Sequence, residues 1–506
     1  MRKFLSVLMV VLFTVAMCGT AMAAADLQIM GGAGGAGKNT GDGGGGYGGY
    51  VGVDEENNNT ANKNGGDGIF DSVTYGEYGT AVVGGGGGGG GHGKNANTEG
   101  GTGGPGFGEG VTVGDDGGPG EENDVGGAGG DGGPKDSSGE YLGGDGGDGG
   151  GNSEYAGGGG GGNAEFTLGK NLTVDNLLVQ GGNGGEDGSS SKGGGGGDAT
   201  LVVNSGSTLT VEGNLEVKGG AGGSGAGKGG VVGVDVKGAL KLTGTNRTFK
   251  LDKMGTDKIN LYIKELDLSN SGLINLDLGG AIGDSVEINK IILDGCTGFY
   301  ISNGMIKNNT IGTLEVKTGM GVIDPGVNLK FTKVDLGGQL AMANDSDLRF
   351  DTLYVMGKNA VLSSFNGLKV TDDRTLIFNI ANVKNKDNML MVGFGEVSFT
   401  GGKLEFDGTA ALSLGDMVGL IMVTNDAELI GEESVVNPAR YYKGYTFEIG
   451  VLEMKDDSGS VYAKVLGLKV TGVPQSSDDG GGCNAEFGFL ALALLGSVPF
   501  VLRKNS

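Results

Sequence analysis

Residues Leu172 to Gly182 read L-T-V-D-N-L-L-V-Q-G-G, and residues Leu209 to Gly220 read L-T-V-E-G-N-L-E-V-K-G-G. Both segments open with Leu-Thr-Val and an acidic residue, and both end in Gly-Gly. Near copies at a fixed spacing are typical of repeat architectures. Apolar residues alternate with polar ones in each copy, which predicts short β-strands.

The same strand-rich element recurs further along the chain, punctuated by Gly, Asn and Asp. Its clearest later copies are Ile259–Leu268, Val286–Leu293, Ile311–Val316, Val327–Leu336 and Leu348–Val355. They begin 16 to 27 residues apart, whereas a β-sandwich shows turns about every 8–12 residues. We therefore predict an all-β fold, a right-handed parallel β-helix or solenoid over residues 164–400 with Gly-rich insertions. Stacking would bury a row of Val, Ile and Leu, because no single repeat can cover its own apolar face.

The β character continues to the end of the body. The alternating pattern extends through Leu376–Ile380, Met389–Val397 and Ala410–Val423. Three pieces rich in Tyr and Val then predict a closing antiparallel meander within residues 401–472: Tyr441–Ile449, Val451–Met454 and Ser460–Val465. A meander in this place would cover the open end of the stack.

Glycine dominates the first part of the chain, because residues 31–230 hold 79 of the 117 glycines. This density excludes helices and ordinary core packing, and seven prolines in the whole chain are too few for collagen. We predict a Gly-rich, low-complexity, partly ordered region over residues 24–163. One alternative is a disordered stalk. In the other, glycine runs pack side by side as extended rods, since backbones without Cβ atoms can approach and hydrogen-bond directly.

The amino terminus has the three parts of a secretory signal peptide, which we predict over residues 1–23. Met1–Lys3 is basic, Phe4–Met17 is apolar, and Ala21-Met22-Ala23 gives the small-x-small pattern. Cleavage is expected between Ala23 and Ala24. The export machinery and signal peptidase are therefore expected partners.

The carboxyl terminus, residues 473–506, carries a second signal. A polar spacer leads into Gly480, Gly481, Gly482, Cys483, Asn484 and Ala485. The uncharged stretch Phe487–Leu502 follows, and a helix of this length covers about 24 Å, slightly less than a hydrocarbon core of roughly 30 Å. Arg503 and Lys504 would stay on the cytoplasmic side as a stop. We predict one transmembrane helix here, over residues 487–502, that retains the exported chain at the membrane.

This tail, residues 476–506, resembles the Synergist-CTERM protein-sorting domain. The resemblance rests on the run 480–485, the Leu/Ala-rich stretch and the basic pair. The resemblance implies that a membrane-bound sorting or processing enzyme recognises the tail and that the protein reaches the cell surface. It also implies that Cys483 is a point of cleavage or lipid attachment. A plain single-span anchor with an incidental cysteine is the alternative. The body is loosely similar to the passenger regions of autotransporter-type adhesins in its Gly-rich insertions and Leu-Thr-Val repeats.

Charge and rare residues narrow the range of functions. The formal charge of −25 repels nucleic acid, so no nucleic-acid partner is expected. Cys296 is the one cysteine between the terminal signals, so no disulfide is expected within the body, and we predict that its thiol is buried. His92 is the single histidine and lies between glycines, which predicts a solvated loop residue without partners for a catalytic triad or metal site.

Two ligand-binding motifs are matched only in part. Gly32–Lys38 and Gly222–Lys228 read G-x-x-x-x-G-K, but neither continues with Ser or Thr. Gly126–Asp131 and Gly143–Asp148 match the first six positions of a calcium-binding nonapeptide, but glycine replaces its aliphatic residue. Such matches arise by chance in a glycine-rich chain. We expect no cofactor, and only weak, diffuse Ca²⁺ binding by an acidic surface.

These observations predict a non-enzymatic, membrane-anchored protein of the bacterial cell envelope with a structural or adhesive role. Its further partner would be an extracellular glycan or protein. A surface-attached, polysaccharide-active β-helix enzyme is the main alternative, because carboxylates are numerous although no pair of them stands out. An ice- or surface-binding glycine-rod protein is a third.

Overall fold

The computed structural model describes residues 26–33, 69–70, 78–83, 86 and, with short gaps, 159–474. The gaps are 186–193, 224–226, 254–258, 282–285, 325–328, 343–346, 357–359, 365, 382–389, 394–395, 409–410, 425–427, 432–440 and 456. The predicted signal peptide and the predicted transmembrane helix lie outside the described residues.

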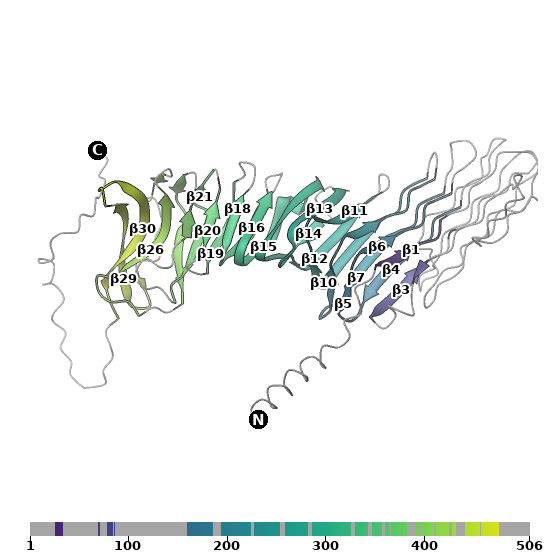
Figure 1. Ribbon diagram of the computed structural model, residues 1–506, viewed down its shortest axis with the longest axis horizontal. Helices are drawn as coiled ribbons and strands as arrows, with labels where there is room; N and C mark the ends of the chain where they lie inside the picture. The colour runs from purple at the N-terminus through teal and green to yellow at the C-terminus, as the bar shows by residue number, and fades with distance from the viewer. Residues whose placement is uncertain are drawn as a thin grey trace, which may run out of the picture. The chain divides into compact units, whose positions relative to one another are not determined.

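Nearly all regular structure in the described residues is β-strand (Figure 1). The strands fall into two compact units. The first unit comprises the described residues up to Asp267 with Ile274–Ile288 and Ser302–Lys307. The second comprises Leu268–Leu273, Asn289–Ile301 and the described residues from Asn308 onward. The all-β prediction is thereby confirmed.

The first unit contains fourteen of the described strands. They are β1 (Leu27–Met30), β2 (Ile69–Phe70), β3 (Gly79–Val83), β4 (Ala164–Leu168), β5 (Leu172–Val174), β6 (Leu177–Gln180), β7 (Ala199–Val203), β8 (Thr208–Val211), β9 (Leu215–Lys218), β10 (Val232–Leu242), β11 (Arg247–Asp252), β12 (Ile259–Asp267), β13 (Gly272–Ala281, from Ile274) and β14 (Val286–Ile288).

Three ladders of parallel strands build the first unit. One joins β4, β7, β10, β12 and β14; the second joins β5, β8 and the end of β10; the third joins β1, β6, β9, β11 and β13. The near copies recognised in the sequence lie on each other in register, with Leu172 opposite Leu209 and Leu177 opposite Leu215. Within these ladders each strand pairs with its counterpart one repeat later, which is compatible with a β-helix or solenoid, whereas β2 and β3 pair antiparallel with β1 and β4.

The interior of the first unit is made of apolar rows that run along each ladder, from one strand to the next. Phe166, Leu201, Val234, Leu261 and Val286 are consecutive register partners, and each is at most 2% exposed. Burying one such side chain fully contributes about 1.5–3 kcal/mol relative to leaving it exposed. The predicted interior row of Val, Ile and Leu is therefore present, and a phenylalanine joins it.

Asparagine and aspartate side chains directly before strands form hydrogen bonds to the next repeat. Asn176 Oδ1 accepts a hydrogen bond from the Asn214 amide at 2.7 Å, and Asn214 Oδ1 accepts one from the Thr248 amide at 3.0 Å. Asn163 and Asp198 form a second such series, through the amides of Asp198 and Val231. These bonds satisfy backbone N–H groups that the strand ladders leave without a partner.

The second unit continues the β pattern with longer strands at its start. Its strands are β15 (Lys290–Gly304, to Ile301), β16 (Thr310–Asp324), β17 (Lys330–Leu336), β18 (Gln339–Met342), β19 (Arg349–Val355), β20 (Val361–Ser363), β21 (Leu368–Thr371), β22 (Thr375–Asn379), β23 (Leu390–Val392), β24 (Val397–Thr400), β25 (Lys403–Asp407), β26 (Met417–Thr424), β27 (Leu429–Ile430), β28 (Tyr441–Tyr442), β29 (Tyr445–Lys455) and β30 (Val461–Gly472).

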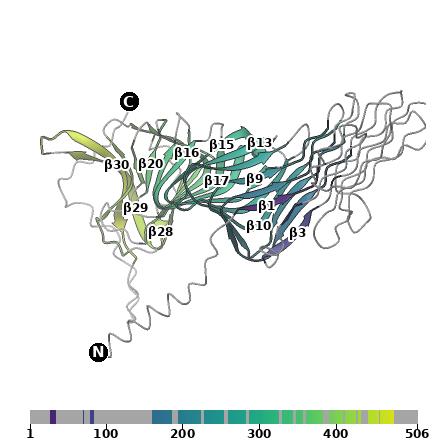
Figure 2. The same cartoon turned by 45° about the vertical axis from the view of Figure 1, so that its right-hand side comes forward.

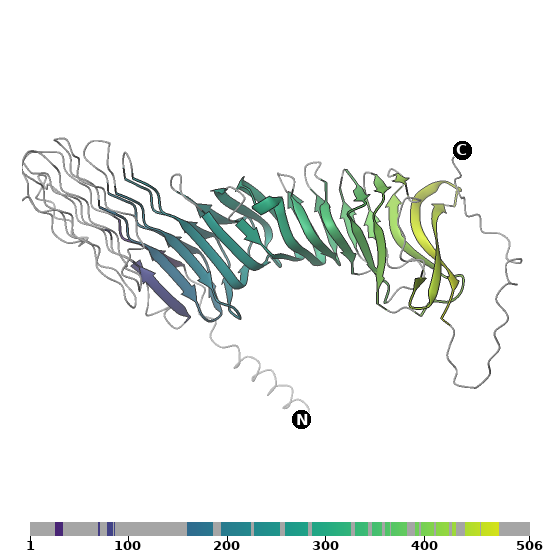
Figure 3. The ribbon, with the colours of Figure 1, turned by 180° about the vertical axis from the view of Figure 1, so that it is seen from behind.

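Parallel ladders again dominate this unit, and Figure 3 shows their strands side by side from behind. One ladder joins β16, β17, β19, β22 and β25; another joins β15, β16, β18, β20, β23 and β26; a third joins β21, β24 and β27. The repeat length varies within both units. In the second unit Lys333 pairs with Thr352, 19 residues on, and Leu390 with Ile421, 31 residues on. In the first unit Leu261 pairs with Val286, 25 residues on, and Leu172 with Leu209, 37 residues on.

Antiparallel strands close the second unit (Figure 2). β26 pairs in parallel with β23 on one edge and antiparallel with β30 on the other, and β30 pairs antiparallel with β29. Phe406 packs edge-to-face against Tyr442 and Phe447, with ring centroids 5.9 and 5.6 Å away. Antiparallel pairing as predicted for this end of the body joins β26, β30, β29 and β28, whereas β25 and β27 still pair in parallel with β22 and β24.

The interior row makes a direct prediction about stability. Leu201→Ala should lower the free energy of unfolding by about 2–5 kcal/mol, because the Leu201 side chain is fully buried and its loss leaves a cavity in the interior row. Val202→Ala, next to it on the outer face of β7, should cost less than about 1 kcal/mol. Urea denaturation followed by circular dichroism measures both. Equal losses for the two variants would contradict the assigned orientation of β7.

Candidate interaction surfaces

Glycine runs extend directly from the strands of the first unit. Some runs follow a strand (β1, β6 or β9), and we call these outward runs. Others precede a strand (β4, β7 or β10), and we call these inward runs. We call them together the glycine sheaf, defined by the described residues 31–32, 159–162, 181–185, 194–197, 219–223 and 227–230. These residues are not in strands, yet the glycines at 161–162 and 196–197 are buried.

Backbone hydrogen bonds link outward and inward runs of the sheaf directly. The Gly162 amide donates to Gly32 O at 2.7 Å, the Gly182 amide to Gly162 O at 2.8 Å and the Gly197 amide to Gly182 O at 2.8 Å. The series continues from Gly220 to Gly197 at 2.9 Å. Along the strands, apolar side chains fill the space between these ladders. In the glycine runs that continue from the strands, few side chains are present and the backbones contact one another directly.

Close approach, rather than an unusual backbone conformation, explains why these positions are glycine. A Cβ atom on Gly182 would lie 1.8 Å from Gly32 O, and one on Gly161 would lie 2.0 Å from Gly182 O. Neither glycine has a φ in the left-handed range. Any side chain would break the hydrogen bonds of its own run and of its neighbour. For the described runs, the alternative of packed glycine rods is confirmed.

The sheaf also decides the meaning of one G-x-x-x-x-G-K match. In the segment from Gly222 to Lys228, the Gly223 amide already donates to Gly194 O at 2.8 Å, and a Cβ on Gly222 would lie 2.2 Å from Gly227 O. The segment leads into β10, whereas a phosphate-binding loop leads into a helix. Its described residues, 222–223 and 227–228, belong to the sheaf.

Most other residues singled out in the sequence lie outside the described residues. These are Ala21, Ala23, Ala24, His92, both calcium-type segments, Lys38, Gly480 to Ala485, and Arg503 with Lys504.

The prediction of a buried thiol at Cys296 is wrong, because this cysteine is exposed. The parallel register of β15 shifts between Leu293 and Gly295, and Gly295 has a φ of +81°. The bulge interrupts the alternation of inward and outward side chains. It places Thr297 inside, where its hydroxyl lies 2.7 Å from that of Ser271.

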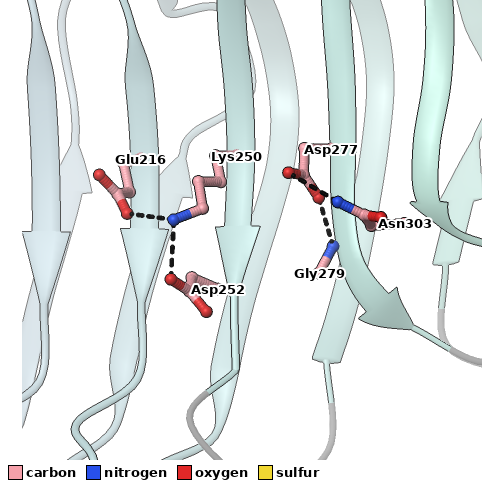
Figure 4. Close-up of polar contacts among 6 residues, drawn as sticks. All are labelled: Glu216, Lys250, Asp252, Asp277, Gly279 and Asn303. Atoms are coloured by element: carbon pink, nitrogen blue, oxygen red, sulfur yellow. Dashed lines mark hydrogen bonds and ion pairs between the residues drawn. The ribbon is translucent and has the colours of Figure 1, made fainter.

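Polar side chains on the outer face of the first unit contact one another within a strand and between neighbouring strands (Figure 4). Lys250 Nζ lies 2.8 Å from Asp252 Oδ2 and 3.1 Å from Glu216 Oε1. The hydrogen bond to Asp252 is the main cause that raises the pKa of Lys250, with Glu216 adding to it against partial burial. Close by, Asp277 accepts hydrogen bonds from the Gly279 amide at 3.0 Å and from Asn303 Nδ2 at 3.2 Å.

A second polar cluster lies on the outer face of the second unit. The Tyr354 hydroxyl donates to Asp407 Oδ2 at 2.7 Å and accepts from Asn379 Nδ2 at 3.2 Å. Lys333 Nζ lies 5.3 Å from the centre of the Tyr354 ring and 2.8 Å from Asp335 Oδ1. Partial burial and the hydrogen bond to Asp407 raise the pKa of Tyr354 to about 12. The same hydrogen bond lowers the pKa of Asp407.

Sequence reasoning missed this cluster for a clear reason. Tyr354 and Asp407 are 53 residues apart and come together only through the register of β19, β22 and β25. The alternation within Leu348–Val355 places Tyr354 on the outer face, but the lengths of two intervening repeats decide which residue lies beside it.

Gly182→Ala tests whether the sheaf is held by close backbone contact. The substitution should lower the thermal midpoint and speed hydrogen exchange at the amides of Gly162, Gly182 and Gly197, because the new Cβ cannot fit. Gly233→Ala, within β10, is the matched control. Its Cβ would lie 3.4 Å from Thr200 Oγ1, an ordinary contact, so it should be neutral or stabilise by roughly 0.5–1 kcal/mol. Unchanged exchange in Gly182→Ala would refute close packing.

The Tyr354 cluster predicts a pH dependence at the alkaline end. The folded pKa of about 12 exceeds the ordinary value of 10.0, so the stabilisation is complete below pH 10 and is lost as pH rises through 12. Ultraviolet titration of phenolate should therefore show a late phase that Tyr354→Phe removes and Asp407→Asn shifts to lower pH. Tyr462→Phe, elsewhere in the second unit, should leave that phase in place. Persistence of the phase in Tyr354→Phe would disprove the assignment.

Within the described ranges, three or more His, Cys, Asp or Glu side chains nowhere gather in a way that could hold a metal ion. The same ranges contain no helix with the length and apolar character that crossing a bilayer requires. Comparison of the chain with family models, with curated proteins and with solved structures gives no match.

Proposed function

We propose that the chain is exported, is retained at the cell envelope by its C-terminal segment, and has a structural or adhesive role there. The observation that carries this proposal is the continuous backbone hydrogen bonding from strand ladders into the glycine sheaf. Such a body keeps its form without a disulfide, a cofactor or a large aromatic core. Its repeated outer faces carry polar side chains, and such side chains could contact a partner.

In this proposal each unit is part of a parallel β-helix. The three-ladder pairing, the apolar rows and the Asn and Asp bonds between repeats support that interpretation. The body between the terminal signals would be the exported part. The whole chain has 61 acidic and 36 basic residues, and this excess of acidic residues favours solubility and loose cation binding.

The tail supplies the retention step. The Gly-Gly-Gly-Cys-Asn-Ala run at 480–485, the uncharged stretch 487–502 and the basic pair Arg503-Lys504 support recognition by a membrane-bound sorting enzyme. Signal peptidase would act at the other end, after Ala23. The exported body would then meet an extracellular glycan or protein.

Fractionation of cells that express the chain tests the proposal. The intact protein should be found in the envelope with Ala24 as its first residue, and a variant that ends at Gln475 should be released. Cys483→Ser should change the mass of the mature C-terminus or abolish retention if that cysteine is processed. Cys296→Ser is the matched control, because it removes an exposed cysteine from the body and should change neither.

Two outcomes would refute the proposal. One is recovery of intact and truncated forms from the same compartment. The other is intact protein in the cytosol with Met1 still attached. Mass spectrometry of both termini, together with the fractionation, distinguishes these outcomes.

A further inference from the structure

A shallow hollow of about 390 Å³ lies on the outer face of the first unit, over β10 and β12. These strands pair in parallel beside β7 and β14 (Figure 1). Gly233 is one of the residues that line it, with Thr200 as register partner on one side and Asn260 on the other. The hollow exists because the row of outward side chains is interrupted at Gly233.

The fold does not require glycine at this position. A Cβ on Gly233 would lie 3.4 Å from Thr200 Oγ1, 3.6 Å from Thr200 Cγ2 and 3.9 Å from Ala199 O, all ordinary contacts. Its φ is outside the left-handed range. In the sheaf, by contrast, a Cβ on Gly182 would lie 1.8 Å from a carbonyl oxygen. Glycine within a strand weakens it, and often marks a place where a ligand approaches closely.

The walls of the hollow combine one aromatic ring with several polar groups. Asp235, Tyr262 and Glu287 form the adjacent outward row, as consecutive register partners on β10, β12 and β14. Lys307 lies at the rim. Asp235 also pairs with Lys237, with Oδ2 at 2.9 Å from Nζ. The volume lies at the small end of the roughly 300–1,000 Å³ typical of ligand sites, and the hollow is open to solvent.

We infer that this hollow binds one sugar unit of an uncharged polysaccharide. A pyranose ring presents C–H groups that pack against an aromatic face, and hydroxyls that donate to carboxylates and pair with an amide and a threonine hydroxyl. Tyr262, Asp235, Glu287, Asn260 and Thr200 supply these groups around the space that Gly233 leaves. A uronic acid would bring its carboxylate towards Asp235 and Glu287, so charge favours a neutral sugar.

The inference rests on the proposed adhesive role and names the class of its ligand. It depends on neither the tail nor the sorting step. Binding is therefore measured on purified full-length chain in solution, apart from the fractionation that tests retention. Either result can fail while the other holds.

The experiment compares variants of the full chain on a panel of neutral oligosaccharides, with uronic acid oligosaccharides as the contrast. Binding is measured by isothermal titration calorimetry. Gly233→Val fills the hollow with a strand-favouring residue and should weaken binding of the neutral ligand at least about tenfold. Tyr262→Ala should weaken it similarly without changing the strand backbone. Thr210→Val, on the outer face of β8, is the matched control and should stay within about twofold of the unaltered chain.

Thermal unfolding verifies that each variant is folded, and Tyr262→Ala decides the matter if Gly233→Val is not. Loss of neutral-sugar binding in the hollow variants, with the control unaffected, supports the site. No binding of any neutral oligosaccharide, equal binding by Gly233→Val or Tyr262→Ala, or preference for uronic acids would overturn it. Release of new reducing ends from the bound oligosaccharide would replace it with an enzymatic function.

Discussion

The hydrogen bond from a backbone amide of one repeat to a carbonyl of the next is the interaction on which this structure depends. It sets the register in which Leu172 lies on Leu209 and Leu177 on Leu215. Register in turn decides which side chains form the buried rows and which reach the outer face, because a shift by one residue would exchange the two. The Asn and Asp bonds between repeats extend this control to positions just before the strands begin.

The side chains between facing ladders determine the distance between their backbones. Along the strands, rows such as Phe166, Leu201 and Val234 fill the interior, and burial of apolar surface stabilises it. In the sheaf no side chain separates the runs, so amide and carbonyl groups of facing runs bond instead. One chain thus uses two kinds of cohesion, and the change from one to the other coincides with the Gly-Gly pairs that end the near copies.

Much of the fold could be predicted from the sequence because its repeats are close copies with clean alternation. The β content, the interior row and the antiparallel closure all follow from patterns within single segments. Features that depend on register over longer distances could not be predicted. Cys296 is exposed because a bulge at Gly295 breaks the alternation, and Tyr354 meets Asp407 only after two intervening repeats. Gly233 looks like any other glycine until its neighbours in space are known.

The glycine sheaf has a chemical consequence for the durability of the chain. Its runs consist of backbone with hardly any side chain to oxidise or crosslink, and its core glycines have their amides engaged in hydrogen bonds. Proteases that select substrates through a side-chain pocket find little to hold there, and cleavage would first require several bonded runs to separate. Such a segment would be slow to accumulate chemical damage or proteolytic nicks.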